Sequence, residues 1–248
     1  MRYAVVRTEA TAEVQSFLRQ RAAVFFTFGF PLLVVALVGT LVAGGAGPFD
    51  HPQSYYLPGY LGFLVVLTPL TRVGSTVARH REQRRFEKLQ TTPLTVQEWF
   101  LAHVAVTVGF ILAASLLVSV LVVLLGGHLP LAPGVLVFVA VGTVLFCAIG
   151  AIVGALADSQ DGVVAASNAL GLPIVLLAET FVPPELLPAG VRLVVPVVPL
   201  TYFSRGIRAT LAGDTLPALQ DLGILVGITA VLVTVAIVLV PWQRRGLP

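Results

Sequence analysis

The sequence predicts an all-α membrane protein with six transmembrane helices, and its composition and hydropathy pattern carry that prediction. Hydrophobic residues make up 57% of the 248 residues and charged residues only 11%, about half the charged share of a soluble domain. The mean hydropathy is +0.95, which excludes a soluble fold because a chain of this length could not bury so much apolar surface. The apolar residues fall into six runs, each near the roughly 20 residues that cross a bilayer. We place these spans at about residues 22–43, 57–78, 98–125, 134–157, 162–181 and 218–240.

The segment before the first span, residues 1–21, is predicted to form an amphipathic helix on the inner membrane surface. Its sparse apolar residues recur at helical spacing. Glu9 and Glu13 come early and Arg19 and Arg21 come late, which is the order that the helix dipole favours. An ordinary cytosolic extension of the first span is the alternative.

The basic residues predict the orientation of the spans. Twelve of the fifteen Lys and Arg residues lie at the N-terminus, after the sixth span, or around the connection between spans two and three, where Arg72 is included. Only Arg192, Arg205 and Arg208 fall on the opposite side. Because Lys and Arg gather in cytoplasmic loops, both termini are predicted to be cytoplasmic. Basic residues at the ends of apolar runs also favour anionic lipid over nucleic acid as their partner.

The connection from Arg79 to Trp99 is predicted to begin as a cytosolic helix. Nothing between Arg79 and Gln90 breaks a helix, and Phe86 and Leu89 are the only large apolar residues there. They lie three positions apart, hence on one face, and no core is evident for them to fill. We therefore expect this face to dock a partner, whereas a solvated basic hairpin that only fixes topology is the alternative.

The second half of this connection predicts a rigid turn and a clean re-entry into the membrane. Pro93 disfavours helical conformation in Thr92 and so ends the cytosolic helix. Thr95 and Glu98 have the spacing of a capping box, in which each side chain bonds the other residue's backbone N–H. The third span therefore begins near residue 96, with Trp99 expected at the membrane interface.

Two other connections carry candidate sites. The short inner loop from Asp158 to Asp161 holds no basic residue, so it is either a protein contact or a plain polar turn. The outer connection, residues 182–217, is apolar yet rich in proline, and we expect two short helices dipping into or lying along the outer leaflet. Pro199 suits a first helical position. Glu179, at the outer end of the fifth span, is either a functional acid neutralised by an arginine or an interfacial side chain reaching water.

The sequence offers no catalytic constellation. It contains no Gly-x-x-x-x-Gly-Lys-Ser/Thr run, so the chain is not expected to bind ATP in the P-loop manner. Cys147 is the single cysteine and lies in an apolar segment, and the four histidines are scattered over different segments. We therefore assign no catalytic, cofactor-binding or metal-binding residue. Gly142, Gly150 and Gly154 allow close helix packing, either inside one subunit or at a dimer seam.

Several of these segments, taken together, resemble ABC-2-type transporter permeases. The run from Arg84 to Trp99 is similar to the Glu…Leu…Thr-Pro-Leu…Glu signature between the second and third spans of that family. The six spans, the N-terminal amphipathic helix and the segments Glu179-Thr-Phe-Val-Pro-Pro and Val198-Pro-Leu-Thr-Tyr-Phe agree with it. The resemblance covers essentially the whole chain.

The resemblance implies export across the cytoplasmic membrane of a prokaryote. Two six-span permeases would pair, as a homodimer or heterodimer, each with a separate ATPase subunit that binds ATP and Mg²⁺. Asp158 and Asp161 would supply a second contact with the ATPase. The outer helix pair would contribute gate candidates, namely Glu179, Pro199, Tyr202, Arg205 and Arg208. The helix around Glu82 to Leu94, the coupling helix of this family, would lie in a groove of the ATPase. Its docking residues would be Glu82, Arg85, Phe86, Glu87, Leu89, Thr92, Pro93 and Leu94.

Other function classes remain open at this point. A secondary transporter would normally place ionisable groups near the membrane midplane, where the spans offer little beyond Asn168 and scattered hydroxyls. A lipid-modifying membrane enzyme and a non-transporting anchor for a soluble partner are further alternatives. The small outer loops and apolar spans favour a lipophilic or amphipathic cargo, such as a drug or lipid.

Overall fold

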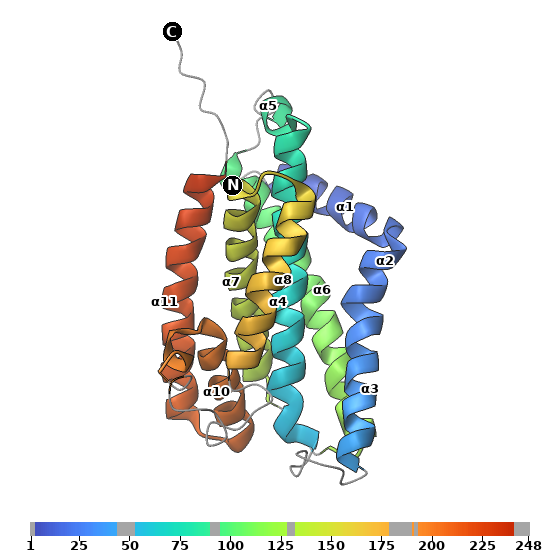
Figure 1. Ribbon diagram of the computed structural model, residues 1–248, viewed down its shortest axis with the longest axis vertical. Helices are drawn as coiled ribbons and strands as arrows, with labels where there is room; N and C mark the ends of the chain where they lie inside the picture. The colour runs from blue at the N-terminus through green and yellow to red at the C-terminus, as the bar shows by residue number, and fades with distance from the viewer. Residues whose placement is uncertain are drawn as a thin grey trace.

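A computed structural model describes residues 3–43, 53–89, 95–127, 132–178, 190 and 193–240. Its described part is a bundle of long helices that run side by side (Figure 1). Six of these segments are long and apolar enough to cross a membrane, which confirms the all-α, six-span prediction. They are Arg21–Thr40, Ser54–Glu82, Val96–Leu124, Gly134–Leu156, Gln160–Leu177 and Thr215–Leu239.

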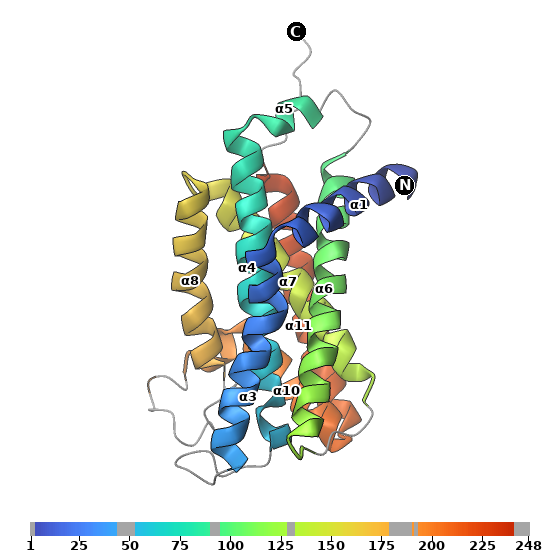
Figure 2. The same ribbon diagram turned by 90° about the vertical axis from the view of Figure 1, so that its right-hand side faces the viewer.

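One helix, α1, lies across one end of the bundle, and α5 caps the same end (Figures 1 and 2). We call this the α5 end and the opposite one, where α10 lies, the α10 end. The elements are α1 (Tyr3–Arg19), α2 (Arg21–Val24), η1 (Phe25–Gly29), α3 (Phe30–Ala43), η2 (Gln53–Tyr56), α4 (Leu57–Glu82), α5 (Arg85–Leu89), α6 (Val96–Leu124), α7 (Gly134–Leu156), α8 (Gln160–Leu177), η4 (Val195–Val197), α10 (Pro199–Ala212) and α11 (Thr215–Leu239).

The centre of the bundle is the contact between α4 and α7, which are the most buried of the long helices. A side chain on Gly150 would meet the Leu70 carbonyl at 2.5 Å, and one on Gly154 would meet the Gly74 carbonyl at 2.3 Å. Only glycine permits backbones to approach this closely. The glycines of α7 therefore serve the interior of one subunit, which settles the question that the sequence left open.

The first span is not a regular helix. Its backbone widens into the π-helical turn η1 directly before α3, whose second residue is Pro31. Proline lacks an N–H and crowds the carbonyl four residues earlier, here that of Thr27, and a π-turn is a common way to relieve such a conflict. The irregular turn lies beside the cleft described below.

The α10 end is closed by a short helix that packs on the bundle by its apolar face. Pro199 opens α10, as predicted; Leu200, Phe203 and Ile207, which recur at helical spacing, are fully buried, and Leu211 is partly buried. Arg205 lies on the exposed side. Helix spacing thus divides the segment into a buried face and a charged face.

Three spans, α3, α8 and α11, expose most of their surface. Their outward side chains include Leu33 and Leu37 on α3, Leu172 and Leu176 on α8, and Val238 on α11. Surfaces this apolar need hydrocarbon or another apolar surface around them. The periphery of the bundle therefore suits a lipid environment, and α3 and α8 flank the same face of α4 (Figure 2).

Candidate functional site

An ionic cluster joins α1 to two spans near the α5 end. Glu13 of α1 accepts a hydrogen bond from Arg72 of α4 at 2.8 Å. Its other carboxylate oxygen lies 3.5 Å from Nε2 of His103 on α6. The three side chains are partly or fully buried, and α1 makes its main helix contact with α6. This cluster holds α1 against the bundle.

Aromatic rings complete the cluster. The guanidinium of Arg72 lies 4.5 Å from the ring centre of Phe17 and 5.2 Å from that of Phe110, both within cation–π range. Burial alone would raise the pKa of the Glu13 carboxyl, but its hydrogen bond to His103 and the charges of His103 and Arg72 outweigh burial and lower this pKa to about 2. Glu13 therefore stays ionised at neutral pH and balances Arg72.

The sequence reasoning missed this cluster because it counted Arg72 among the charges of the cytosolic connection. In the structure Arg72 lies within α4, ten residues before the helix ends at Glu82. A charge inside an apolar run is itself the available signal, since such residues are costly in a membrane and normally have a partner. Glu13 and His103 gave no comparable local signal, because their roles depend on tertiary contacts.

A second cluster of rings anchors α5. Phe86 packs edge-on against Trp99, with ring centres 5.3 Å apart, and against His80 at 5.4 Å. Trp99 in turn packs on His103 at 4.4 Å. Phe86 is only 3% exposed, so the expectation that it projects without a core to fill is wrong. Trp99 is fully buried among these rings.

The same cluster revises the interpretation of the histidines. His80 and His103 are not scattered, because their rings lie 6.2 Å apart at 89°. Each Nδ1 lies within hydrogen-bond distance of the carbonyl four residues earlier, on Thr76 and Trp99 respectively. Within the described ranges no three His, Cys, Asp or Glu residues gather in a way that could hold a metal ion. The two rings therefore act as packing elements between α4 and α6.

The re-entry into the third span has the predicted capping box. Oγ1 of Thr95 accepts a hydrogen bond from the Glu98 N–H at 3.2 Å, and the Glu98 carboxylate accepts one from the Thr95 N–H at 3.0 Å. The helix begins at Val96, as the sequence indicates. Predicted docking residues Thr92, Pro93 and Leu94, which precede the box, lie outside the described residues.

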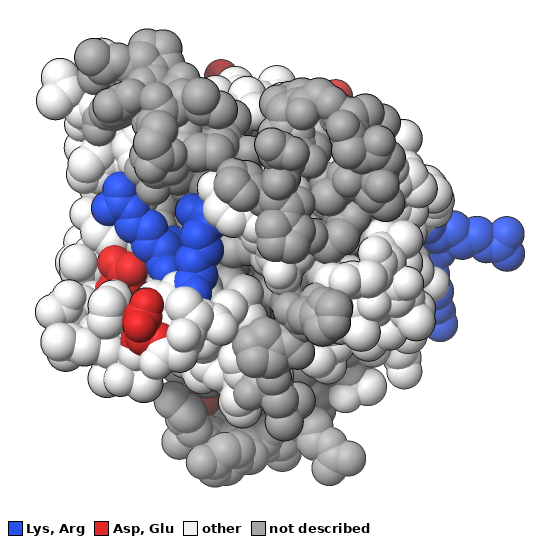
Figure 3. Space-filling view, turned by 90° about the horizontal axis from the view of Figure 1, so that it is seen from below, with Lys and Arg blue, Asp and Glu red and all other residues white. Residues whose placement is uncertain are grey.

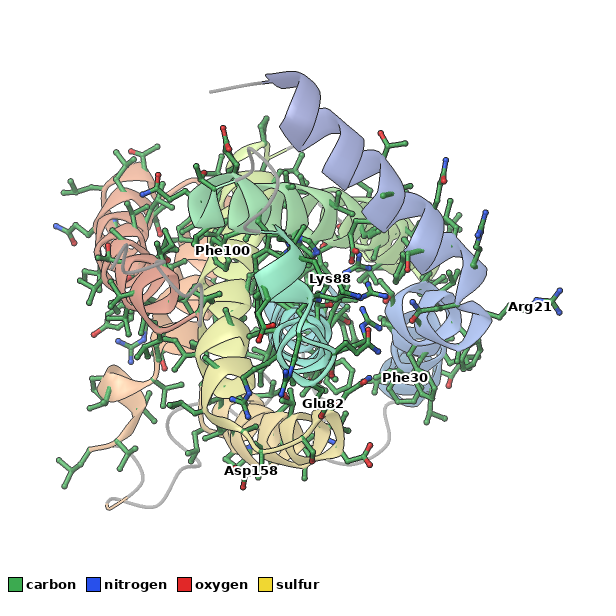
Figure 4. The ribbon with its side chains drawn as sticks, turned by 90° about the horizontal axis from the view of Figure 1, so that it is seen from above. Arg21, Phe30, Glu82, Lys88, Phe100 and Asp158 are labelled. Atoms are coloured by element: carbon green, nitrogen blue, oxygen red, sulfur yellow. The ribbon has the colours of Figure 1, made fainter. Side chains whose placement is uncertain are left out.

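The end of α4 is fastened to the turn between α7 and α8. Arg81 donates hydrogen bonds to the carbonyls of Ala155 and Ala157, and Glu82 accepts one from the Gln160 N–H at 2.8 Å. A carboxylate at this position also complements the dipole of α8, which begins at Gln160. The two connections thus meet through Glu82 and Gln160, and Glu82 and Asp158 lie on the same side of the bundle in Figure 4.

The outward face of the hairpin that α4 and α5 form is charged. Arg84, Arg85, Glu87 and Lys88 are all exposed, whereas Leu89 is only partly exposed and packs on the ring cluster. Arg84 takes a left-handed backbone conformation with φ of 52°, which lets α5 turn away from the axis of α4 (Figure 2). Asp158 and Asp161 lie nearby on the α7–α8 turn. Among the described residues of this hairpin and turn, a partner would meet exposed side chains of both charges.

A cleft of about 560 Å³ opens beside α4. The α4 helix forms its floor, α1 to α3 form one wall and α8 forms the other. The floor carries a polar stripe at helical spacing, whose members include Thr68, Thr71, Arg72, Ser75, Thr76 and Arg79. Phe26, Phe30 and Phe63 supply an aromatic wall, with the Phe30 and Phe63 ring centres 5.9 Å apart. Its volume suits a small ligand.

At the α10 end, the predicted gate residues differ in whether they make contacts within the chain. The Tyr202 hydroxyl donates to the Pro196 carbonyl at 2.8 Å, and Arg208 stacks over the Tyr55 ring at 5.1 Å. Figure 3 shows basic and acidic side chains gathered side by side on this face. Glu179, predicted to pair with an arginine here, lies outside the described residues. The structure therefore brings Tyr202 and Arg208 into fixed contacts near Pro199 and leaves Arg205 exposed.

Six membrane-length helices with a charged hairpin at one end define a multi-pass membrane protein. A family model described as ABC-2 type transporter matches residues 5–212. The chain therefore belongs to the ABC-2 type transporter family and is a membrane component of an ABC transporter, a class that works with an ABC ATPase. A comparison with curated proteins found no match.

Proposed function

We propose that this chain is the permease subunit of an ATP-driven exporter and that the α5 end docks its ATPase. The observation that carries the proposal is the hairpin of α4 and α5, which stands beyond the bundle (Figure 1) and exposes charged side chains. A hairpin that only fixed topology would need the charges but not the buried Phe86 anchor. Its ring cluster and its bonds to the α7–α8 turn give the hairpin a defined shape.

Within this proposal the docking residues have two roles. Arg85 and Glu87, with Asp158 and Asp161 on the adjoining turn, face outward and would contact the ATPase. Phe86 and Glu82 are positioning residues, because their side chains are engaged inside the chain. Thr92, Pro93 and Leu94 would complete the docking surface. ATP and Mg²⁺ would be bound by the ATPase, and this chain would relay the motion of the motor.

Orientation and assembly follow from the same proposal. The α5 end carries Arg79, Arg81, Arg84, Arg85 and Lys88 and would face the cytoplasm of a prokaryotic cell. Two permease subunits, alike or different, would pair with two ATPase subunits. The exposed faces of α3 and α8 flank the cleft, so a cargo of amphipathic character would travel along it, such as a drug or lipid.

Co-purification tests the docking proposal. The double variant Arg84→Glu/Arg85→Glu is co-expressed with the matching ATPase. The amount of ATPase that co-purifies is expected to fall about tenfold or more, because the reversed charges repel the partner's surface. Arg205→Glu is the matched control, since Arg205 is also exposed but lies on α10. Retention of the ATPase by the double variant at the level of the control would contradict the docking proposal.

The outer gate is tested separately. Glu179→Gln is expected to slow export into or out of reconstituted vesicles while leaving the permease–ATPase complex intact, because an acid at this depth is costly unless it serves a function. ATP hydrolysis and transport are measured on the same preparation. Transport unchanged from the parent chain would return Glu179 to an interfacial role.

A further inference from the structure

The cleft beside α4 is not electrically balanced. Its lining includes one acid, Glu13, and two arginines, Arg72 and Arg79. Glu13 is already engaged with Arg72. The remaining positive charge belongs to Arg79, one turn before the end of α4. A cleft with an excess charge at the edge of the hydrocarbon attracts an ion of opposite sign.

Arg79 is also unsatisfied in its hydrogen bonding. Its Nε is buried and has no hydrogen-bond partner among the described residues, and no ion pair involving Arg79 occurs within them. By contrast, Arg72 and Arg81 on the same helix are bonded to a carboxylate and to carbonyls. A buried guanidinium N–H normally has an acceptor. The Arg79 guanidinium therefore lines the cleft without an acceptor among the described residues.

The rest of the cleft suits the two parts of an amphipathic molecule. Hydroxyls of Thr71 and Ser75 share the floor with Arg79, and Asn168 lies on the opposite wall. Farther along α4, Phe63 and Phe30 form an apolar wall. Arg79 and Phe63 are sixteen residues apart on α4, which corresponds to about 24 Å along a helix. This distance spans a headgroup and much of one acyl chain. Figure 4 shows nitrogen-bearing side chains in the space between α4 and α3, where Phe30 is labelled.

We propose that the cleft binds an anionic amphipathic molecule, with its anionic headgroup on the Arg79 guanidinium and its apolar part against the phenylalanine wall. Phosphate or carboxylate oxygens would accept from the terminal N–H groups of Arg79, which lines the cleft, since a guanidinium offers paired donors to anions. The hydroxyl-bearing floor would bond further headgroup oxygens. Naming this molecule as the cargo rests on the proposed function, whereas its binding does not.

Binding to the purified full chain in maltoside detergent tests the proposal without any ATPase. The probes are fluorescently labelled phosphatidylglycerol, whose phosphate is anionic, and diacylglycerol with the same label, which lacks a phosphate; binding is followed by fluorescence anisotropy. The anionic probe is expected to bind about tenfold more tightly, since a hydrogen bond to a charged group is worth about that factor or more. Arg79→Gln should remove this preference, and Asn168→Asp should weaken binding of the anionic probe alone.

The matched control is Arg21→Gln, which removes a charge at the same end of the bundle but outside the cleft; Arg21 points away from the helices in Figure 4. It should leave the preference unchanged. Arg79→Gln should also leave the thermal unfolding midpoint of the ligand-free chain no lower, because Arg79 has no partner among the described residues to lose. A decrease in the midpoint as large as that caused by breaking an ion pair would overturn the proposal, because it would show that Arg79 stabilises the ligand-free chain.

Four further results would overturn it. Equal affinity for the two probes would show that the cleft does not select an anion. An equal loss of the preference in Arg79→Gln and Arg21→Gln would show that Arg79 does not bind the headgroup. Inorganic phosphate that displaces the anionic probe at the probe's own concentration would show that the apolar wall adds nothing. A change in the oligomeric state of Arg79→Gln, with probe binding intact, would assign the cleft to a second copy of the chain. None of these results bears on ATPase docking, so failure here leaves the permease proposal standing.

Discussion

The two ends of the bundle are held by different kinds of contact. At the α5 end, charged and polar side chains bridge elements far apart in sequence: Arg72 to Glu13 over 59 residues and Gln160 to Glu82 over 78. At the α10 end, the hydrogen bonds of Thr201 and Tyr202 reach back only six residues, and a long-range charged contact joins Arg208 to the Tyr55 ring. There α10 is held chiefly by its buried apolar face.

The difference indicates which end can respond to a partner. The strength of ionic contacts at a partly solvated surface changes with small displacements and with local charge. Close apolar packing is insensitive to charge but intolerant of added volume. We therefore expect the α5 end to respond to charge changes and the α10 end to volume changes.

The largest effect is expected from Phe86→Ala. Truncating a buried phenylalanine costs about 3 kcal/mol, and here the loss falls on the contact between α5 and the rings of Trp99 and His80. The amides of α5 should lose protection in hydrogen exchange while those of α4 and α7 keep theirs. Gln83→Ala, on the exposed side of the same hairpin, is the control and should change nothing. Equal protection in the two variants would show that the ring cluster does not anchor α5.

Next in size is Glu13→Gln, with an expected loss of about 2 kcal/mol from leaving Arg72 without its anion, discounted for partial exposure. The free energy of unfolding is measured by titration with dodecyl sulfate, and exchange of α1 amides locates the loss. In a double-mutant cycle the pair Glu13→Gln/Arg72→Gln should cost less than the sum of the single variants. Strict additivity would mean that the pair contributes nothing.

The same ion pair predicts a pH dependence. The pKa of Glu13 is lowered in the folded state from its ordinary 4.5 to about 2, so its ionised form stabilises the fold. That contribution is fully present above pH 4.5 and is lost as the pH falls towards 2. Detachment of α1 in this window should be absent in Glu13→Gln, whose amide does not titrate. An identical pH profile in parent and variant would contradict the assignment.

At the α10 end the corresponding test is one of volume. A methyl group on Gly206 would lie 2.2 Å from ring atoms of Phe138 on α7, and overpacking of this kind costs about 1 to 3 kcal/mol. Gly206→Ala should lower the unfolding free energy, and Phe138→Leu should restore part of it. Gly227→Ala, which meets nothing within 4 Å on α11, should be neutral or slightly stabilising. A neutral Gly206→Ala would show that α10 is held loosely.

Local sequence signals predicted local structure well and tertiary partners poorly. The span count, the capping box at Thr95 and the opening of α10 at Pro199 each follow from adjacent residues, and the structure has all three. The burial of Phe86 depends on rings that lie on two other helices, which spacing within its own helix could not reveal. The pairing of Arg72 likewise depends on a distant element, because Glu13 lies 59 residues away on α1.

The smallest effect is expected from the capping box, which is a local polar contact at the α5 end. Thr95→Ala removes the acceptor of the Glu98 N–H and should cost about 1 kcal/mol, seen as faster exchange at the first turn of α6. Thr95→Ser keeps the hydroxyl and should behave like the parent chain. Thr234→Ala removes a threonine hydroxyl that bonds only the Ala230 carbonyl in mid-helix, so it should leave α6 unaffected. If amide exchange at the first turn of α6 were equal in Thr95→Ala and Thr95→Ser, apolar burial and not the cap would set the start of the third span. The contrast between the two ends would then rest on the Glu13 cluster and the α4–α8 contacts.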